Sequence, residues 1–274
     1  MIQDCEKGTC IEENKRKECP YWAELFPCTF VILLDILVCK YYIDIQKVEW
    51  RFSIFSYGFA VLCICWWLFL SISRCVQSGI GGFYDIYWYC NIALLLTAVG
   101  IVLGSPTLIG QSMCLLLLPH ITFWIDIFSY PCFKVCPINA FPYMFDKATP
   151  FLEKFTSIHH FWYFPGLIVV LWKQPLLSLW SYGISIILFG ILNFLSYFMT
   201  PKEYIYEDGT TRYLNICVAH EYPEFARTIP PFKYTIGKSF WFMFFITVTC
   251  YIIPANLIAY LIIIGLQKCV NSFF

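Results

Sequence analysis

Seven long apolar runs place the strongest constraint on how this chain can fold. A helix needs about 20 mainly apolar residues to cross a hydrocarbon layer about 30 Å thick. The runs do not show the period-2 alternation that is typical of membrane barrel strands. We therefore predict an all-α integral membrane protein with about seven transmembrane helices. The predicted spans are residues 26–43, 53–73, 86–104, 107–129, 157–172, 176–199 and 239–266.

The composition agrees with a membrane environment. Hydrophobic residues make up 59% of the 274 residues and charged residues only 13%, whereas an average soluble domain is about 25% charged. We predict one polytopic transmembrane domain over residues 24–268, preceded by a polar, cysteine-containing tail at 1–23. The tail lacks the apolar core of a signal peptide.

The first and last runs carry features that interrupt a simple span. Asp35 and Lys40 lie inside the first run, and a charge in mid-membrane costs a few kcal/mol unless it is paired or hydrated. Whether this run crosses fully stays open, and so does the choice between Asp35 as a proton or ion site and Asp35 paired with Lys40. Pro254 in the last run predicts a bend.

The basic residues predict the orientation. With seven spans, thirteen of the 18 Lys and Arg residues fall on the N-terminal side, which is the cytosolic side by the positive-inside rule. The N-terminus is therefore expected in the cytosol, or in the matrix if the membrane is mitochondrial. The long loops 130–156 and 200–238 are expected on that side too, and within the first of them residues 145–155 fit either a short interfacial helix or an ordinary loop.

Ionisable residues gather near the cytosolic ends of several predicted spans. Cys90 is expected about 6 Å inside its span, and His159 and His160 about one turn inside theirs. Asp126 lies near the cytosolic end of the span at 107–129. These positions predict a cytosol-facing polar pocket, with His120 deeper and apart from it. Residues expected to line the pocket are Trp88, Asn91, His159, Asn193 and Tyr197.

This set of residue types suits acyl-transfer chemistry. A thiolate is a nucleophile, a neighbouring histidine can take its proton, and a carboxylate can orient the imidazole. We expect Cys90 to attack, His160 to exchange the proton, and Asp126, or alternatively Asp146, to orient the histidine. The open alternative is that Cys90 only packs. The cysteine clusters of the tail and loops contain no CxxC pair, so we predict neither a metal nor a cofactor.

Several segments resemble an uncharacterised bacterial family of multi-pass membrane proteins over residues 83–262. They are Asp85–Leu94, Trp124–Asp126, Tyr143–Asp146, His160–Trp162, Leu195–Tyr197 and Asn215. More distantly, His160 with Pro165, and Cys90 with Asn91, resemble YwaF-type membrane proteins and the membrane-embedded lipid acyltransferases and fatty-ester hydrolases of the androgen-induced group. That resemblance implies a nucleophile at Cys90 and a base at His160.

Three functions follow as hypotheses. The first is a lipid acyl-ester hydrolase or acyltransferase with a Cys/His site at the cytosolic face. The second is a structural or assembly subunit of a larger membrane complex, and the third is a transporter that uses Asp35 or His120 as an ion or proton site. The expected partners are membrane lipids and partner membrane subunits, and no nucleic acid.

Overall fold

The computed structural model describes most of the chain from Tyr21 onward. The described residues are 21–44, 50, 52–139, 141–147, 149–205, 211–213, 216–220, 222, 227, 229–235 and 237–272. Nearly all of the predicted polar tail, together with Asn215, therefore lies outside the described residues.

Helices dominate the described structure. The longer ones are α1 (Tyr21–Val38), α2 (Ile54–Ser78), α3 (Tyr89–Leu103), α4 (Pro106–Phe133), α6 (His159–Leu171), α7 (Leu179–Met199) and α10 (Ile253–Ser272). The shorter ones are η1 (Cys39–Ile43), η2 (Gly79–Tyr87), η3 (Pro142–Met144), α5 (Phe151–Thr156), η4 (Ile216–Val218), η5 (Phe232–Thr235), α9 (Phe240–Ile246) and η6 (Thr247–Ile252). Strands β1 (Glu203–Ile205) and β2 (Thr211–Tyr213) pair antiparallel.

Five helical stretches in the described residues are long and apolar enough to cross a membrane. They are Phe26–Ile43, Ile54–Gln77, Pro106–Phe133, Leu179–Met199 and Phe240–Ser272. These stretches are those of an integral membrane protein with several spans. In the other two predicted runs, α3 has 15 residues and α6 has 13, fewer than the roughly 20 that a perpendicular crossing needs. Seven spans therefore stay a prediction.

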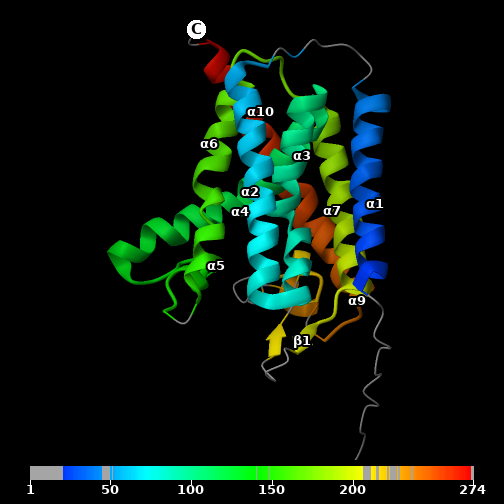
Figure 1. Cartoon of the computed structure of the whole chain (residues 1–274), viewed down its shortest axis with the longest axis vertical. Helices are drawn as coiled ribbons and strands as arrows, with labels where there is room; N and C mark the ends of the chain where they lie inside the picture. Colours follow the sequence, from blue (N-terminus) through cyan, green and yellow to red (C-terminus); the bar gives the residue numbers. More distant parts are fainter. Residues whose placement is uncertain are drawn as a thin grey trace, which may run out of the picture.

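Helix α4 occupies the middle of the molecule. Most of the long helices run along the long axis, whereas α4 crosses them and its C-terminal end projects to one side (Figure 1). Helix α4 contacts α3, α6, α7 and α10. Its apolar window is 67% buried, against 17–33% for the windows of the other four spans. A helix that is apolar all round is expected in such an interior position. The side chains around the candidate site are therefore arranged about α4.

The turn from α3 to α4 is fixed by three consecutive residues. Gly104 ends α3 in the left-handed conformation with φ of 63°, which glycine adopts without steric cost. Ser105 then caps α4, because its hydroxyl accepts from the backbone N–H of Leu108, and Pro106 stands at the first helical position, where its missing N–H costs nothing. The sequence thus turns the chain within two residues.

Small residues let α4 and α7 approach closely. A Cβ atom added at Gly110 would lie 2.3 Å from the Ser181 hydroxyl oxygen. Membrane helices commonly pack through such small side chains, because these bring the two backbones into van der Waals contact. Gly110 therefore sets the α4–α7 distance.

The last apolar run and the loop before α6 both differ from regular helix. The stretch Phe240–Ser272 is divided by the π-helical segment η6, and Pro254 follows it as the second residue of α10. The irregularity therefore lies immediately before the proline that predicted a bend. In the loop 130–156, the stretch 145–155 becomes α-helical only from Phe151 onward, after Pro150 at the N-cap, and this helix ends at Thr156.

Candidate functional site

Three reactive side chains converge where two helices begin. Cys90 is the second residue of α3, while His159 and His160 are the first two residues of α6. One nitrogen or sulfur atom from each of the three lies within 4.8 Å of the other two. His159 is 2% and His160 4% exposed, and Cys90 is partly buried. The structure thus places the predicted nucleophile beside both histidines.

Local structure brings the two helix starts to the same level. Trp88, the N-cap of α3, has non-helical backbone angles (φ −58°, ψ 137°) and separates α3 from the 3-10 segment η2. The side chain of Asn91 fixes this corner, since its amide donates to the Asp85 carbonyl at 2.6 Å while its oxygen lies 3.6 Å from the Cys90 sulfur. On the other helix, α5 ends at Thr156 and α6 starts three residues later.

A hydrogen bond to the backbone fixes the tautomer of His159. Its Nδ1 lies 2.8 Å from the Thr156 carbonyl oxygen, and a carbonyl can only accept, so Nδ1 carries the proton. The lone pair is therefore on Nε2. That atom is buried and has no hydrogen-bond partner among the described residues. A buried polar atom without a partner is uncommon in folded proteins and calls for a functional explanation.

His160 is oriented by a second imidazole. The Nδ1 of His120 lies 2.9 Å from the Leu116 carbonyl oxygen, so His120 donates there and its Nε2 is left to accept. The Nδ1 of His160 donates to this Nε2 at 3.3 Å, which leaves the lone pair of His160 on its own Nε2. The expectation that His120 stands apart is wrong, because depth along one helix does not include the tilt and offset between helices.

Asp126 holds a loop next to the histidines. Its carboxylate accepts backbone N–H groups of Ile138 at 2.9 Å, Asn139 at 3.3 Å and Phe141 at 3.3 Å. The ring of Phe141 in turn lies 5.5 Å from that of His160. These bonds give Asp126 a structural part in covering His160. For the alternative, Asp146, the side chain is exposed, and its backbone carbonyl accepts from Lys154 Nζ at 2.5 Å.

The two pocket residues predicted on α7 contact a different region. The Asn193 amide donates to the Cys217 carbonyl at 2.9 Å. Tyr197 stacks on Phe240 with ring centroids 3.9 Å apart, in a separate apolar cluster with Tyr222. Their described contacts therefore go to η4 and α9, and not to Cys90.

Sequence reasoning missed Arg74, which joins α2 to η2 and to α5, the helix before α6. Its guanidinium lies 3.6 Å from Asp85 and 3.4 Å from Glu153, and it donates to the Thr156 hydroxyl at 3.1 Å. Thr156 is the residue whose carbonyl orients His159. The sequence feature that could have indicated this residue is a single arginine directly after an apolar run, with acidic residues in the segments that follow.

Tyr143 supports the same connection from the loop. Its hydroxyl lies 2.9 Å from that of Ser157. Burial raises the pKa of Tyr143 to about 12, although the hydrogen bond with Ser157 opposes this rise. The phenol therefore stays protonated at neutral pH and can donate to Ser157.

Asp35 belongs to a second polar cluster between α1 and α4. Its carboxylate accepts from the Gln111 amide at 2.5 Å, and the Cys39 sulfur lies 3.8 Å from it. Lys40 donates to the Leu103 carbonyl at 2.5 Å, so the described hydrogen bonds favour Gln111 over Lys40 as the partner of Asp35. On α4, Gln111 of this cluster lies nine residues before His120.

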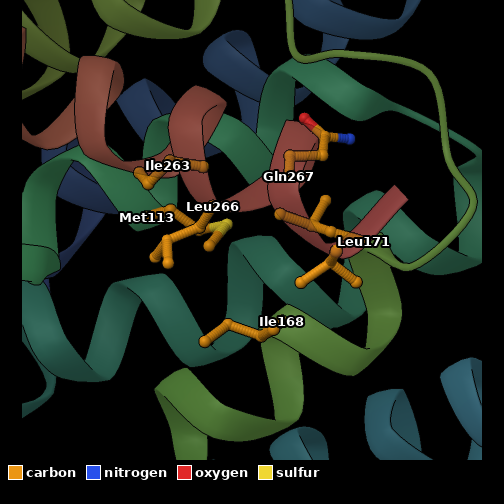
Figure 2. A pocket seen from close by; sticks show the side chains of 7 residues that line it. Met113, Ile168, Leu171, Ile263, Leu266 and Gln267 are labelled. Carbon is orange, nitrogen blue, oxygen red and sulfur yellow. The ribbon is translucent and has the colours of Figure 1, made fainter. Parts of the chain in front are cut away.

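Two cavities are lined mainly by apolar side chains, and no histidine lines either of them. One of about 10 Å³ lies between α4, α6 and α10 near Met113, Ile168 and Leu171 (Figure 2), room for about one water molecule. The other is a groove of about 340 Å³ on α2 and α6, lined by Phe55, Gly58, Phe59, Leu62, Trp162 and Gly166. A polar pocket open to the cytosol stays a prediction.

No family model, curated protein or solved structure matches this chain.

Proposed function

We propose that this protein is a membrane-embedded enzyme that transfers or hydrolyses the acyl group of a lipid ester, with Cys90 as the nucleophile. The observation that carries the proposal is the approach, within 4.8 Å, of the Cys90 sulfur and imidazole nitrogens of His159 and His160. A thiol and an imidazole form the nucleophile–base pair of covalent catalysis when they come within hydrogen-bond reach, and apo sites are often looser than the reacting complex.

We assign the proton transfer to His160, whose ring is oriented by His120. When its Nε2 takes the thiol proton, the Nδ1–H is already donated to His120 Nε2, so the new positive charge is shared with a second ring. His159 has only a carbonyl in that position, and the nearby Arg74 guanidinium opposes a further positive charge. His120 thus takes the orienting role that the sequence suggested for Asp126.

The reaction balances in two steps. The Cys90 sulfur bonds to the ester carbonyl carbon as its proton passes to His160, and the lipid alcohol leaves with that proton. The thioester then passes its acyl group to water, which yields a fatty acid, or to the hydroxyl of a second lipid, which yields a new ester. Both routes restore the thiol.

The groove on α2 and α6 fits the acyl chain of such a substrate. It is lined by apolar side chains and two glycines, and Trp162 in its wall lies one turn along α6 from His159. An apolar chain in this groove would therefore have its ester end close to the level of Cys90.

Acylation of Cys90 is the test. Purified protein in lipid nanodiscs is treated with an activated palmitoyl ester, and intact-protein and peptide mass spectrometry locates the added acyl group. We expect one hydroxylamine-sensitive acyl group on Cys90, lost in Cys90→Ala and strongly reduced in His160→Ala. Cys65→Ala is the matched control, since Cys65 is an exposed thiol on α2. Acylation that ignores both substitutions would reject the proposal.

Transport is the second candidate, because of the Asp35–Gln111 hydrogen bond at 2.5 Å inside the first span. Intramembrane carboxylates commonly mark ion or proton pathways. Proton-coupled uptake into liposomes that disappears in Asp35→Asn, and survives in Cys90→Ala, would favour it.

A further inference from the structure

We propose that Cys90, His159 and His160 also form a binding site for a single Zn²⁺ ion, which holds Cys90 as a metal thiolate and so blocks its reaction with acyl esters. The binding stands on the geometry alone. Only the inhibition rests on the proposed function.

The separations suit a tetrahedral zinc site after small side-chain movements. Zinc bonds of about 2.3 Å to sulfur and about 2.0–2.1 Å to nitrogen place tetrahedral ligand atoms about 3.3–3.6 Å apart. The three candidate atoms are already within 4.8 Å of one another. The ring centroids of His159 and His160 are 4.2 Å apart. The two imidazoles therefore lie together, although consecutive residues on a helix usually do not face each other.

The second layer of hydrogen bonds prepares both imidazoles as ligands. Metal-binding histidines usually donate the other ring N–H to a carbonyl or a similar acceptor, which fixes the tautomer and the ring orientation. His159 donates to the Thr156 carbonyl, and His160 donates to His120, which is itself held by the Leu116 carbonyl. Both Nε2 atoms therefore carry the lone pair that a metal needs.

The buried Nε2 atom of His159 is a second, independent indication. It has no hydrogen-bond partner among the described residues, and His159 is only 2% exposed. A bound cation would satisfy this atom where no donor from the described residues does. The ligands of this cation would be one thiol and two imidazoles, because the cluster contains no carboxylate.

The ligand types select the metal. One thiolate and two imidazoles suit Zn²⁺, whereas Mg²⁺ and Ca²⁺ prefer oxygen ligands. Three protein ligands leave the fourth position open, as in catalytic zinc sites. With one thiolate the ion keeps a net charge of +1, which favours an anionic fourth ligand such as hydroxide or a fatty-acid carboxylate.

Cobalt substitution tests the site without any acyl substrate. Metal-free protein in nanodiscs is titrated with Co²⁺, whose visible spectrum reports tetrahedral geometry and whose near-ultraviolet charge-transfer band reports thiolate ligation. We expect one Co²⁺ per chain with a thiolate band, and its displacement by Zn²⁺. Cys90→Ala should remove the band, and His159→Ala and His160→Ala should weaken binding at least about tenfold. His120→Phe, which keeps a ring but removes the orienting bond, should weaken binding about 10–100-fold with the band retained.

The controls separate this proposal from the acyl reaction. His220→Ala changes a histidine that follows η4, contacts Tyr197 and lies outside the cluster of Cys90, His159 and His160, so it should leave the Co²⁺ affinity unchanged. Circular dichroism and size-exclusion chromatography verify that each variant is folded. Zn²⁺ should protect Cys90, but not Cys65, from maleimide. A wild-type protein that binds no Co²⁺, or a thiolate band that persists in Cys90→Ala, overturns the metal site. Metal binding in a protein that is never acylated would reject only the acyl chemistry.

Discussion

Replacing Asp126 separates the structural part of this carboxylate from the catalytic part that the sequence suggested for it. The carboxylate accepts three backbone N–H groups of the loop 138–141. A hydrogen bond to a charged group contributes about 1.5–3 kcal/mol. Ile138 is partly exposed and Asn139 is exposed, so water replaces part of what is lost. We expect Asp126→Ala to lower the free energy of unfolding by about 2–4 kcal/mol.

The substitution Asp126→Asn gives an intermediate result. The new amide would keep one carbonyl oxygen for the N–H groups of Ile138 and Asn139, but its NH₂ group would face the N–H of Phe141. The loss of that one bond should cost about 1–2 kcal/mol. The assay is denaturant unfolding in mild detergent micelles followed by tryptophan fluorescence, together with limited proteolysis of the loop 130–156.

Acylation of Cys90 supplies the decisive comparison. In Asp126→Asn, at temperatures where the protein is folded, the acylation rate should stay within a few-fold of wild type. In His120→Phe the rate should fall about 10²-fold, at the lower end of what a positioned general base contributes. If Asp126→Asn loses acylation while its loop stays as resistant to protease as wild type, the assignment of the orienting role to His120 is wrong.

Three further substitutions test other parts of the structure. Gly110→Ala should destabilise the protein by about 1–3 kcal/mol through overpacking against Ser181. The control is Gly183→Ala, whose added Cβ has no neighbour within 4 Å and which should leave the unfolding midpoint unchanged within error. Equal effects of the two substitutions would contradict close α4–α7 packing. Gly58→Leu fills the groove on α2 and α6 without a clash at Cβ. The rate of acylation by a palmitoyl ester should therefore fall at least about fivefold more than the rate with a butyryl ester, and Gly183→Leu is the control. An equal effect on both esters would place the acyl chain elsewhere. Asp35→Leu leaves the buried Gln111 amide without its acceptor and should lower the free energy of unfolding by about 1–3 kcal/mol. Asp35→Asn should lower it by less than half as much. An Asp35→Leu protein as stable as wild type would show that this hydrogen bond contributes nothing to stability.

The helical class and the convergence of Cys90 with the histidines could be approached from the sequence, because both depend on position along single helices. Cys90 and His160 each lie within one turn of a helix start, and such starts are visible as the edges of apolar runs. The partners of these residues could not be obtained in this way. The bond from His160 to His120 depends on the relative tilt of α4 and α6, and no feature of either run encodes that tilt.

The start of the third predicted span illustrates a second limit. Hydropathy extends the third run to Ile86, but η2 is a 3-10 segment that ends at Tyr87, and α3 itself starts at Tyr89. Apolar residues in a tight connection and in a helix look alike in composition. Similarly, Asp126 was recognisable as an acidic residue in an apolar run, but its loop partners are backbone N–H groups, which carry no sequence signature.

Helix α4 carries a residue of each of two polar clusters, one on either side of Pro119. Gln111 bonds Asp35 on α1, and nine residues further along the same helix His120 bonds His160 on α6, a separation of about 13 Å along the axis. A small sliding movement of α4 along its axis would lengthen or misalign both bonds together. The hydrogen bond of a carboxylate on α1 and the orientation of an imidazole on α6 therefore both depend on the position of α4.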